Sequence, residues 1–477
     1  MIAERPTPSP DLDFRPIFED MRTRYRAAPF PSLAARRAQL DALERAIRSR
    51  RDALRAALYA DFRKPSDETD FTEYVVTLAE LKHARKKLGA WMKPQTADVP
   101  LSLFGSKAEV RYEPKGVVLI LAPWNYPFNL TMSPLIAALA AGNRCIVRPS
   151  EKAPRTRDVM AAIVAEAFAP HDVLCIGGDV EAAEALLKLP FDHIFFTGSP
   201  RVGKRVMAAA AEHLSSVTLE LGGKSPCVVT EDADLDVAAS RIAWGKFLNG
   251  GQTCVAPDYV LVHESVERRF IDKTVAEVAK MYGSSDAARA ASADFCRMID
   301  DGAFGRVSGL LAETVAAGAT VEVGGATDAA QRYVAPTVLS NIGFDAPIMR
   351  EEIFGPVLPV IPFASLEEAL TQINARPKPL ALYAFSTRDA TVDRIVNGTS
   401  SGGTLVNDTV LHLANPDLPF GGVGESGTGN YHGPFGFKAF SHERAVMRQS
   451  KRSLAPLLAP PYGMRTRAMI ALLERLP

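Results

Sequence analysis

The sequence Phe196-Thr197-Gly198-Ser199-Pro200-Arg201-Val202-Gly203-Lys204 lies between a short apolar run and a helical stretch. A glycine turn that joins a strand to a helix presents backbone N–H groups and the positive end of the helix dipole, which suits a phosphate group. The spacing of Gly198 and Gly203 is not that of a GxGxxG fingerprint, and Lys204-Arg205 is not the Lys-Ser/Thr of a Walker loop. The turn therefore predicts either a nucleotide site or an ordinary strand-to-helix connection.

The chain on both sides of this turn alternates between short apolar runs and helical stretches. Apolar runs suited to buried strands lie at 117–122, 145–147, 173–176, 194–196 and 217–221, with helical stretches near 133–141, 155–168, 180–188 and 201–213. This alternation predicts an α/β fold with a doubly wound, Rossmann-like parallel sheet, which we interpret as the nucleotide-binding half.

A second alternating set runs from Cys227 to about residue 406. Helices are expected near 234–248, 265–281, 365–375 and 388–397, and strands near 227–229, 259–263, 381–385 and 403–406. Residues 283–296 are rich in Ser, Ala and Asp and predict a loop. Residues 31–62 predict an amphipathic helical lead-in, and 93–116 a short, partly β-like excursion.

The composition excludes several classes of protein. A chain of 477 residues with 47% apolar and 23% charged residues predicts a globular protein of two or three domains. Lys plus Arg equals Asp plus Glu at 55 each, so neither nucleic acid nor an anionic membrane is expected as an obligate partner. Five cysteines without a CxxC pair indicate a reducing compartment, and residues 1–6 lack an apolar signal core, so we expect a cytoplasmic protein.

One cysteine stands out from the others. Cys254 ends the Gly-rich stretch Gly250-Gly251-Gln252-Thr253, whereas Cys145, Cys175 and Cys227 lie in apolar runs typical of small buried side chains and Cys296 has no assigned role. Glu220 lies inside an apolar strand pattern, where a carboxylate is rarely buried without a partner. A nucleophilic thiol and a carboxylate base are together suited to covalent catalysis.

Motifs that occur in the same order along almost the whole chain resemble the aldehyde dehydrogenase superfamily. They are Pro123-Trp124-Asn125-Tyr126-Pro127, Arg148-Pro149-Ser150-Glu151, Phe196-Thr197-Gly198-Ser199, Glu220-Leu221-Gly222-Gly223-Lys224, Gly251-Gln252-Thr253-Cys254 and Glu351-Glu352-Ile353-Phe354-Gly355-Pro356. The segments 419–424 and 431–442, with Cys254-Val255-Ala256-Pro257-Asp258-Tyr259, resemble the class 3 branch, and within it the bacterial coniferyl-aldehyde dehydrogenase type.

The resemblance implies the catalytic roles. Cys254 would attack the aldehyde, and the Asn125 amide and the Cys254 backbone N–H would hold the resulting oxyanion. Hydride transfer to a nicotinamide would leave a thioester, which water activated by Glu220 would hydrolyse. No metal is implied.

The resemblance also implies a binding site for NAD. Its residues would be Trp124, Arg148, Ser150, Glu151, Gly198, Ser199, Gly203, Leu221, Glu352 and Phe354. The family usually has lysine where this chain has Arg148, and arginine can make two parallel hydrogen bonds to a phosphate. Glu151 would repel a 2′-phosphate, so we expect use of NAD with some activity toward NADP.

The class 3 resemblance implies a homodimer and a division of the chain. It assigns 1–95 and 114–221 to an NAD(P)-binding domain, 222–407 to a catalytic domain, 96–113 and 408–450 to a small β bridging or oligomerisation element, and 451–477 to a tail. The tail is expected to be a packed terminal helix, with a membrane interface as the alternative. His432 and His442 are expected at the subunit interface, and Tyr126 in the substrate funnel, while Phe420 could belong to the funnel or the core.

The substrate remains open at this point. Aromatic aldehydes such as coniferyl aldehyde and medium- or long-chain aliphatic aldehydes are both compatible with the resemblance. A semialdehyde-specific or acyl-transferring enzyme of the same superfamily is an alternative, although Glu220 favours hydrolysis. A non-catalytic binding or structural protein on this fold is a third reading, against which the joint presence of Cys254, Glu220 and Asn125 argues.

Overall fold

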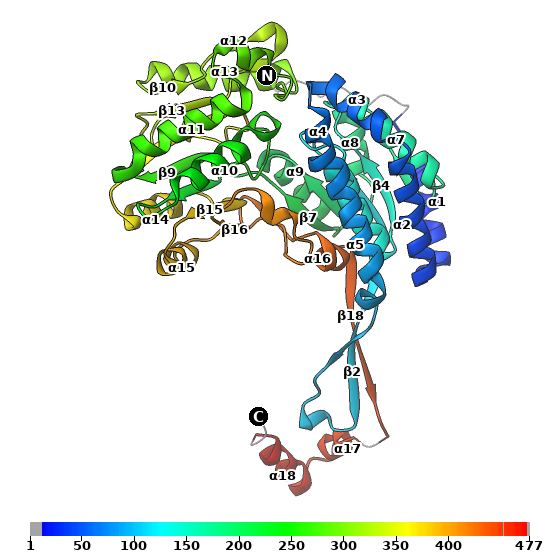
Figure 1. Cartoon of the computed structure of the whole chain (residues 1–477). Coiled ribbons are helices and arrows are strands. Elements are labelled where there is room, and N and C mark those ends of the chain that lie inside the picture. Colours follow the sequence, from blue (N-terminus) through cyan, green and yellow to red (C-terminus); the bar gives the residue numbers. More distant parts are fainter. Residues whose placement is uncertain (1–11, 452, 475–477) are drawn as a thin grey trace, which may run out of the picture.

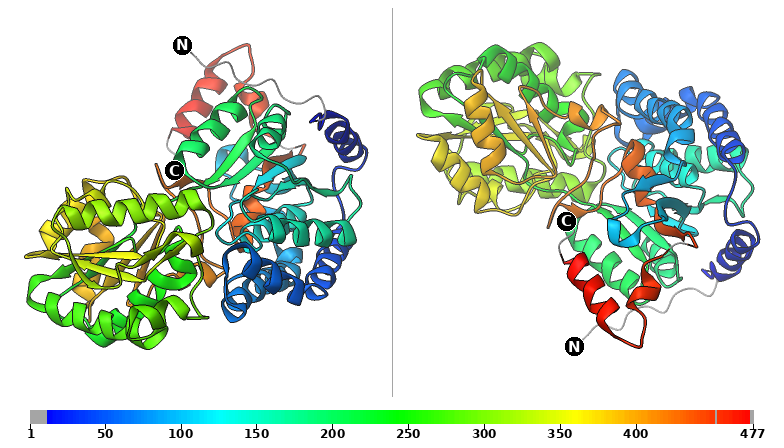
Figure 2. Two further views of the ribbon diagram at one scale, coloured as in Figure 1. Left: turned by 90° about the horizontal axis from the view of Figure 1, so that it is seen from above. Right: turned by 90° about the horizontal axis from the view of Figure 1, so that it is seen from below.

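Two α/β units lie side by side, and a narrow arm of β-strands extends away from them (Figures 1 and 2). The structure, a computed structural model, describes residues 12–451 and 453–474. Residues 1–11, which carry the expected absence of a signal core, lie outside the described part of the chain.

The first unit is built on a six-stranded sheet with the order β17-β7-β6-β3-β4-β5. Its parallel strands are β3 (Val117–Leu121), β4 (Arg144–Arg148), β5 (Val173–Cys175), β6 (His193–Thr197) and β7 (Ser216–Glu220), and β17 (Gly427–Thr428) joins β7 antiparallel. The intervening helices are α6 (Asn129–Ala141), α7 (Pro154–Ala167), α8 (Val180–Leu187) and α9 (Pro200–Ala211). The predicted doubly wound sheet is confirmed. Since β6 and β7 are parallel, Thr197 and Glu220 lie opposite each other at their carboxyl ends.

The second unit contains a seven-stranded sheet with the order β10-β13-β14-β9-β8-β15-β16. Its strands are β8 (Pro226–Val229), β9 (Tyr259–His263), β10 (Thr320–Val323), β13 (Thr337–Ser340), β14 (Val357–Phe363), β15 (Ala381–Phe385) and β16 (Gly403–Val406). Its helices are α10 (Leu235–Phe247), α11 (Glu267–Tyr282), α12 (Asp286–Ala291), α13 (Asp301–Ala316), α14 (Leu366–Asn374) and α15 (Asp389–Gly398). Between β10 and β13 in the sequence, β11 (Thr327–Asp328) and β12 (Tyr333–Val334) form a separate two-stranded antiparallel sheet.

The sequence prediction was wrong or silent at several of these elements. The expected loop 283–296 contains α12, because the Ser285 hydroxyl caps the helix by accepting a hydrogen bond from Ala288 N at 3.2 Å. Strand β14 was not predicted: Pro359 and Pro362 argue against a central strand, and tertiary packing overrides that signal. Helix α13 carries Gly302, Gly305 and Gly309, which lower helix propensity.

The N-terminal helices pack on the first unit. They are α1 (Arg15–Ala27), α2 (Leu33–Arg48), α3 (Arg51–Phe62), α4 (Ser66–Thr69) and α5 (Val75–Trp91). The expected lead-in at 31–62 is therefore two helices, which separate near Ser49. A π-helical turn, η1 (Asp70–Tyr74), joins α4 to α5, and such turns often accompany functional sites.

The arm is a three-stranded antiparallel sheet of β1 (Gln95–Ala97), β2 (Ser106–Pro114) and β18 (Ser441–Gln449), reached through α16 (Gly433–Ala439). At its far end lie α17 (Ala455–Leu458) and α18 (Met464–Leu473) (Figure 1). Helix α18 contacts α17, and most of its side chains are exposed, so the expected packing of the terminal helix is wrong within a single chain. Among the described residues, every helix is too short or too polar to span a membrane.

Candidate active site

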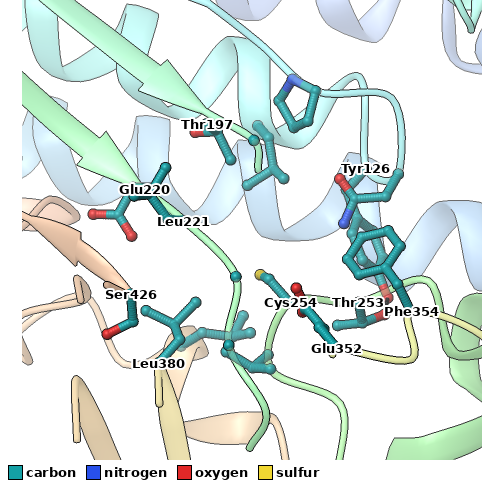
Figure 3. A pocket seen from close by; sticks show the side chains of 18 of the residues that line it. Tyr126, Thr197, Glu220, Leu221, Thr253, Cys254, Glu352, Phe354, Leu380 and Ser426 are labelled. Carbon is teal, nitrogen blue, oxygen red and sulfur yellow. Dashed lines mark hydrogen bonds between the residues drawn. The ribbon is translucent and has the colours of Figure 1, made fainter. Parts of the chain in front are cut away.

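A cavity of about 660 Å³ lies between the two units, at the carboxyl ends of the strands. Loops from both units line it, and among them the structure brings together Asn125, Glu220 and Cys254. Figure 3 shows Cys254, Glu220 and Glu352 around this one cavity. Six of the residues expected to bind the cofactor also line it, namely Trp124, Gly198, Ser199, Leu221, Glu352 and Phe354.

The turn before Cys254 depends on its glycines. Asn249, Gly250 and Gly251 all have positive φ values, of 56°, 60° and 72°. A Cβ atom on Gly251 would lie 2.3 Å from the carbonyl oxygen of Gly355, so a side chain there would collide with backbone. The Gly-rich sequence therefore allows a tight left-handed turn that delivers Cys254 to the cavity.

The Cys254 thiol is protonated in the resting site. Its apolar surroundings, and then the negative charges of Glu352 and Glu220, raise the pKa of the thiol to about 12. To act as a nucleophile, this thiol would first have to lose its proton, because the thiolate is the reactive form of cysteine.

Hydrogen bonds join the loop of Asn125 to the loop of Cys254. The Asn125 side-chain amide donates to the carbonyl oxygen of Gln252 at 3.0 Å, and the Tyr126 hydroxyl lies 2.6 Å from Thr253 Oγ1. An amide carries two N–H groups, so Asn125 retains a second donor for an oxyanion. Tyr126 lines the cavity, as expected for the funnel, and is also buried.

The carboxyl group of Glu220 is buried without a hydrogen-bond or ion-pair partner among the described residues. Its side chain is 3% exposed, and among the described residues neither carboxylate oxygen has a hydrogen-bond partner. Burial raises the pKa of the carboxyl group well above its usual value. A carboxyl group with a raised pKa is suited to accept a proton from water near neutral pH.

Glu352 points into the cavity beside two aromatic rings. A Cβ on Gly222 would lie 2.0 Å from Glu352 Oε2, so glycine is required for this approach. Burial raises the pKa of Glu352 to about 8, and its buried Oε1 has no hydrogen-bond partner among the described residues. The rings of Trp124 and Phe354 meet edge to face at 5.4 Å. Glu351 differs: it is exposed and pairs with Arg306 at 3.1 Å.

Lys224 supports the loop that carries Glu352. Its ammonium group donates to Asp258 at 2.5 Å and to the carbonyl oxygens of Ile348 and Glu351 at 2.8 and 3.0 Å. Asp258 in turn accepts from Ile353 N at 2.9 Å. The sequence analysis quoted Lys224 in a motif without a role, because its partners lie distant in the sequence.

Gly203 has a packing role in this structure. Gly198 N donates to the Glu220 carbonyl oxygen at 3.0 Å, which continues the pairing of β6 with β7, and Ser199 is the N-cap residue directly before α9. A Cβ on Gly203 would lie 2.7 Å from Leu221 Cδ2, so this glycine lets α9 pack closely against Leu221. Gly203 itself is not among the residues that line the cavity.

Arg148, Ser150 and Glu151 lie together after β4, away from the cavity lining. Arg148 pairs with Glu151 at 2.9 Å and donates to the carbonyl oxygens of Gly178 and Asp179 at 3.0 and 2.8 Å. The guanidinium group is therefore already engaged, and it neutralises Glu151.

The two histidines lie in different environments, and only the interior position of His432 differs from the expectation of an interface residue. His432 lines the cavity, stacks on Tyr431 at 4.2 Å and lies 3.7 Å from Glu80, so it is an interior residue of the single chain. Phe420 also lines the cavity, and His442 lies on the exposed arm. In the part of the chain that is described, no cluster of three His, Cys, Asp or Glu side chains is placed to hold a metal.

The sequence analysis missed several residues around the site. Thr197 is buried opposite Glu220, and its hydroxyl has no partner among the described residues. Lys246 is fully buried on α10, and burial lowers the pKa of its ammonium group to about 8. Three further charged side chains, Lys64, Glu68 and Glu73, are buried beneath the catalytic loops. A charged residue within an apolar helical stretch is the one signal that could have indicated them.

The fold is that of an α/β protein in which one cavity, between two sheets, is lined by a cysteine, a buried carboxyl group and an amide. Comparison with known proteins identifies the family: residues 13–446 match the aldehyde dehydrogenase family, and the chain belongs to it. The resemblance found in the sequence is therefore confirmed.

Three relatives are similar over nearly the whole chain. The rat "aldehyde dehydrogenase, dimeric NADP-preferring" is 44% identical over 90% of this chain and 93% of its own length. The mouse "aldehyde dehydrogenase family 3 member B2" is 42% identical over 93% of this chain and 91% of its own. A "probable coniferyl aldehyde dehydrogenase" of Pseudomonas aeruginosa is 42% identical over 94% of this chain and 93% of its own.

A solved structure agrees with the whole architecture. The substrate-bound state of Staphylococcus aureus AldH matches with a TM-score of 0.92 and 42% identity, over 96% of this chain and 99% of that one. The chain is thus an NAD- or NADP-dependent aldehyde dehydrogenase, an enzyme that oxidises aldehydes.

Proposed function

We propose that this enzyme oxidises an apolar aldehyde, aromatic or long-chain aliphatic, to the free acid through a thioester on Cys254. The observation that supports this most directly is that Cys254, Asn125 and Glu220 line one cavity although they come from three distant loops. The division into an NAD(P)-binding domain, a catalytic domain and a bridging element agrees with the two sheets and the arm.

The first half-reaction forms the thioester. The Cys254 thiol releases its proton to water and the sulfur attacks the aldehyde carbon. The carbonyl oxygen becomes an oxyanion that accepts hydrogen bonds from the second N–H of Asn125 and from the Cys254 backbone N–H. Losing one such donor typically costs ~10²–10³ in rate. NAD or NADP, when bound, accepts the hydride that leaves the carbon. Glu352 fits this cofactor, because its buried, unpartnered Oε1 offers an acceptor for a ribose hydroxyl group.

The second half-reaction empties the cysteine. Glu220 takes a proton from water as the water oxygen attacks the thioester carbon. The carbon–sulfur bond breaks, the acid departs, and the thiolate takes back the proton held on Glu220. Transfer to an acyl acceptor does not need this base, so the buried position of Glu220 favours hydrolysis over the acyl-transferring alternative.

The cavity wall supports an apolar substrate. Its apolar side chains include Phe71, Val76, Leu130, Trp244, Leu248, Val410, Leu413, Phe420 and Tyr431. Three cationic side chains that line the same cavity have protein partners: Arg306 bonds to Glu351, Arg350 to Glu313, and Arg376 to the carbonyl oxygen of Phe344. Lys378, which is exposed on the same wall, is a cation that a dicarboxylic or phosphorylated semialdehyde could use, so the preference for apolar aldehydes rests on the apolar wall and on the Pseudomonas relative, which is named for an aromatic aldehyde.

Two variants and one substrate panel test the proposal. The Cys254→Ala enzyme should form no NADH, and activity that survives in it would exclude this nucleophile. Glu220→Gln should give a burst of NADH followed by slow turnover, whereas normal turnover would exclude the deacylation role. The values of kcat/KM should be higher for cinnamyl-type and long aliphatic aldehydes than for semialdehydes.

For the cofactor, we propose NAD with some use of NADP. Arg148 holds and neutralises Glu151 at 2.9 Å, which weakens the repulsion of a 2′-phosphate, and a rat relative is named NADP-preferring. Arg148, Ser150 and Glu151 would then meet the adenosine ribose, while Ser199 and the start of α9 would meet the pyrophosphate.

We also propose a homodimer, located in the cytoplasm. The exposed apolar side chains Leu101, Leu103, Phe104 and Met447 gather on the arm, and a second subunit could cover them. The rat relative is named dimeric. All five cysteines are free, which fits a reducing compartment.

A further inference from the structure

Three charged side chains from the N-terminal helices form a buried charge cluster beneath the active site. They are Lys64, Glu68 and Glu73, which lie just before α4, within α4 and within η1. The side chains of Lys64 and Glu73 are 0% exposed and form an ion pair at 3.0 Å. Charges are rarely buried so completely, and each member of this cluster contacts the loops that carry the catalytic residues.

Glu73 holds the oxyanion loop, residues 123–128, where it enters α6. Its Oε2 accepts hydrogen bonds from Phe128 N at 3.0 Å and Asn129 N at 2.9 Å. A carboxylate that accepts the first N–H groups of a helix also interacts favourably with the helix dipole. The position of Asn125, on the same short loop as Phe128, therefore depends on Glu73.

Lys64 joins this loop to the nucleophile loop, residues 248–254. Its ammonium nitrogen lies 4.0 Å from the centre of the Tyr126 ring, a cation–π contact, while it pairs with Glu73. The hydroxyl of the same tyrosine lies 2.6 Å from Thr253 Oγ1, directly before Cys254. Lys64 thus contacts both Glu73, which caps α6, and the Tyr126 ring, whose hydroxyl contacts the nucleophile loop.

Glu68 holds the other end of the nucleophile loop. Its Oε1 accepts a hydrogen bond from Asn249 N at 2.9 Å, in the left-handed turn. The Asn249 side chain donates to the Asn125 carbonyl oxygen at 2.9 Å. The two loops are therefore bonded to each other and, through the cluster, to one helical segment.

We propose that Lys64 is a positioning residue that aligns the Asn125 amide with the oxygen of the aldehyde whose carbon Cys254 attacks. This inference rests on the proposed function, in which Asn125 stabilises the oxyanion. The alternative is that the cluster only stabilises the fold. The two can be separated, because replacing both members of a buried ion pair with neutral groups often leaves stability unchanged.

The decisive variant is Lys64→Met combined with Glu73→Gln. It leaves neither Lys64 nor Glu73 as an unpaired charge, and Glu68, whose pKa burial already raises to about 7, loses the nearby ammonium group and becomes easier to protonate. The amide oxygen introduced by Glu73→Gln can still accept from the start of α6, but no cation remains to hold the Tyr126 ring. Misplacement of a catalytic group by about 1 Å can cost up to ~10²-fold in rate. We expect the rate of NADH formation in the first turnover, here called the burst rate, to fall at least about tenfold below that of the wild type. The KM for NAD and the rate of Cys254 alkylation by iodoacetamide, which uses no oxyanion donor, should stay near the wild-type values.

Two further variants complete the test. Tyr126→Phe keeps the ring but loses the hydroxyl contact to Thr253, and it should show the same loss of burst rate. It keeps the inference testable if the double variant does not fold. Arg36→Met removes another buried cation, which bonds to the Pro31 and Ala140 carbonyl oxygens at 3.0 and 2.9 Å, and should leave the burst unchanged. Lys64→Arg keeps a cation beside the Tyr126 ring, so its burst rate should lie between those of the wild type and the double variant.

A wild-type burst rate in a folded double variant would overturn the inference. Equal losses of burst rate, alkylation rate and thermal stability would also overturn it, because they would show a purely structural role. Failure of the proposed function would look different: the wild-type enzyme would form no NADH in the first turnover, or Cys254→Ala would remain active.

Discussion

Glu220 is a carboxyl group whose folded environment favours the protonated form. Because burial raises its pKa above the value in the unfolded chain, the native state binds this proton more tightly. The associated stability is fully present below the unfolded pKa of about 4.3 and is lost as the pH rises through the raised folded pKa. The base that we propose for the reaction is thus held at a cost in stability, as expected for a functional group.

Glu220→Gln should therefore stabilise the protein at high pH while slowing turnover. Glutamine fits the same space but cannot ionise, so the advantage over the wild type should be small at pH 5 and grow toward pH 9. A difference in Tm of roughly 1–3 °C is expected at pH 9, from the ~1–3 kcal/mol cost of a buried charge without a partner and an unfolding entropy of ~2.1 cal/mol/K per residue. Thermal unfolding followed by circular dichroism at both pH values measures it, and a pH-independent difference would contradict the expectation.

Glu352→Gln should make Cys254 more reactive at high pH. The pKa of Glu352 is raised to about 8, so at pH 9 its negative charge contributes to the raised pKa of the thiol. Removing that charge should increase the rate of iodoacetamide alkylation at pH 9 by about threefold to tenfold, since one pKa unit changes the thiolate fraction tenfold. At pH 6.5, where wild-type Glu352 is protonated, the two rates should converge. Equal rates at pH 9 would show that the charge does not reach the sulfur.

The loop 348–354 is the element that depends most on one distant side chain. Lys224, at the end of one unit's connection to the other, donates to two carbonyl oxygens of this loop and to Asp258. Its side chain and that of Asp258 are 10% and 5% exposed, so the pair is largely desolvated. The loop is held in place to present Glu352 and Phe354 to the cavity.

Lys224→Met should loosen this loop and leave Asp258 uncompensated. Removing one partner of a buried pair costs about 3–5 kcal/mol, so Tm should fall clearly. Because the loop carries Glu352, the KM for NAD should rise more than the KM for the aldehyde, as measured by initial rates. Lys378→Met, at an exposed lysine on the same cavity wall, is the matched control and should change neither constant. An equal rise in both KM values would contradict the role of the loop in cofactor binding.

The elements themselves were predicted unevenly, for identifiable reasons. The strands of the first unit are continuous apolar runs, because a parallel sheet is covered on both faces, and the prediction for them holds. Strand β14 and helix α13 break local rules with proline and glycine and are stabilised by their neighbours in the second unit. The Ser285 cap, read as a loop signal, begins a short helix instead.

At the scale of the molecule, the arm carries apolar side chains that stay exposed in a single chain. Leu101 and Phe104 are 61% and 60% exposed at its end, beside the pairing of β2 with β18. Apolar side chains so exposed and so close together indicate a contact surface.

Leu101→Glu combined with Phe104→Glu should weaken the proposed dimer. Desolvating two carboxylates in an apolar contact is unfavourable, so the molar mass measured by light scattering should become concentration-dependent and fall toward that of one chain. Val315→Glu on α13, where the side chain is 39% exposed, serves as the control and should leave the molar mass unchanged. A wild-type molar mass for the double variant at low concentration would exclude the arm as the interface.

The sequence by itself determined the alternation of strands and helices, the family and the three candidate catalytic residues, because these depend on local periodicity and on short motifs. The tertiary structure alone decided that Gly203 packs α9 against Leu221, that His432 is an interior residue and that Arg148 is bound to Glu151. It also decided that Lys64 and Glu73, distant in sequence from Cys254, lie beneath it. The physical reason is that burial and charge pairing arise from contacts between distant segments, which periodicity does not encode.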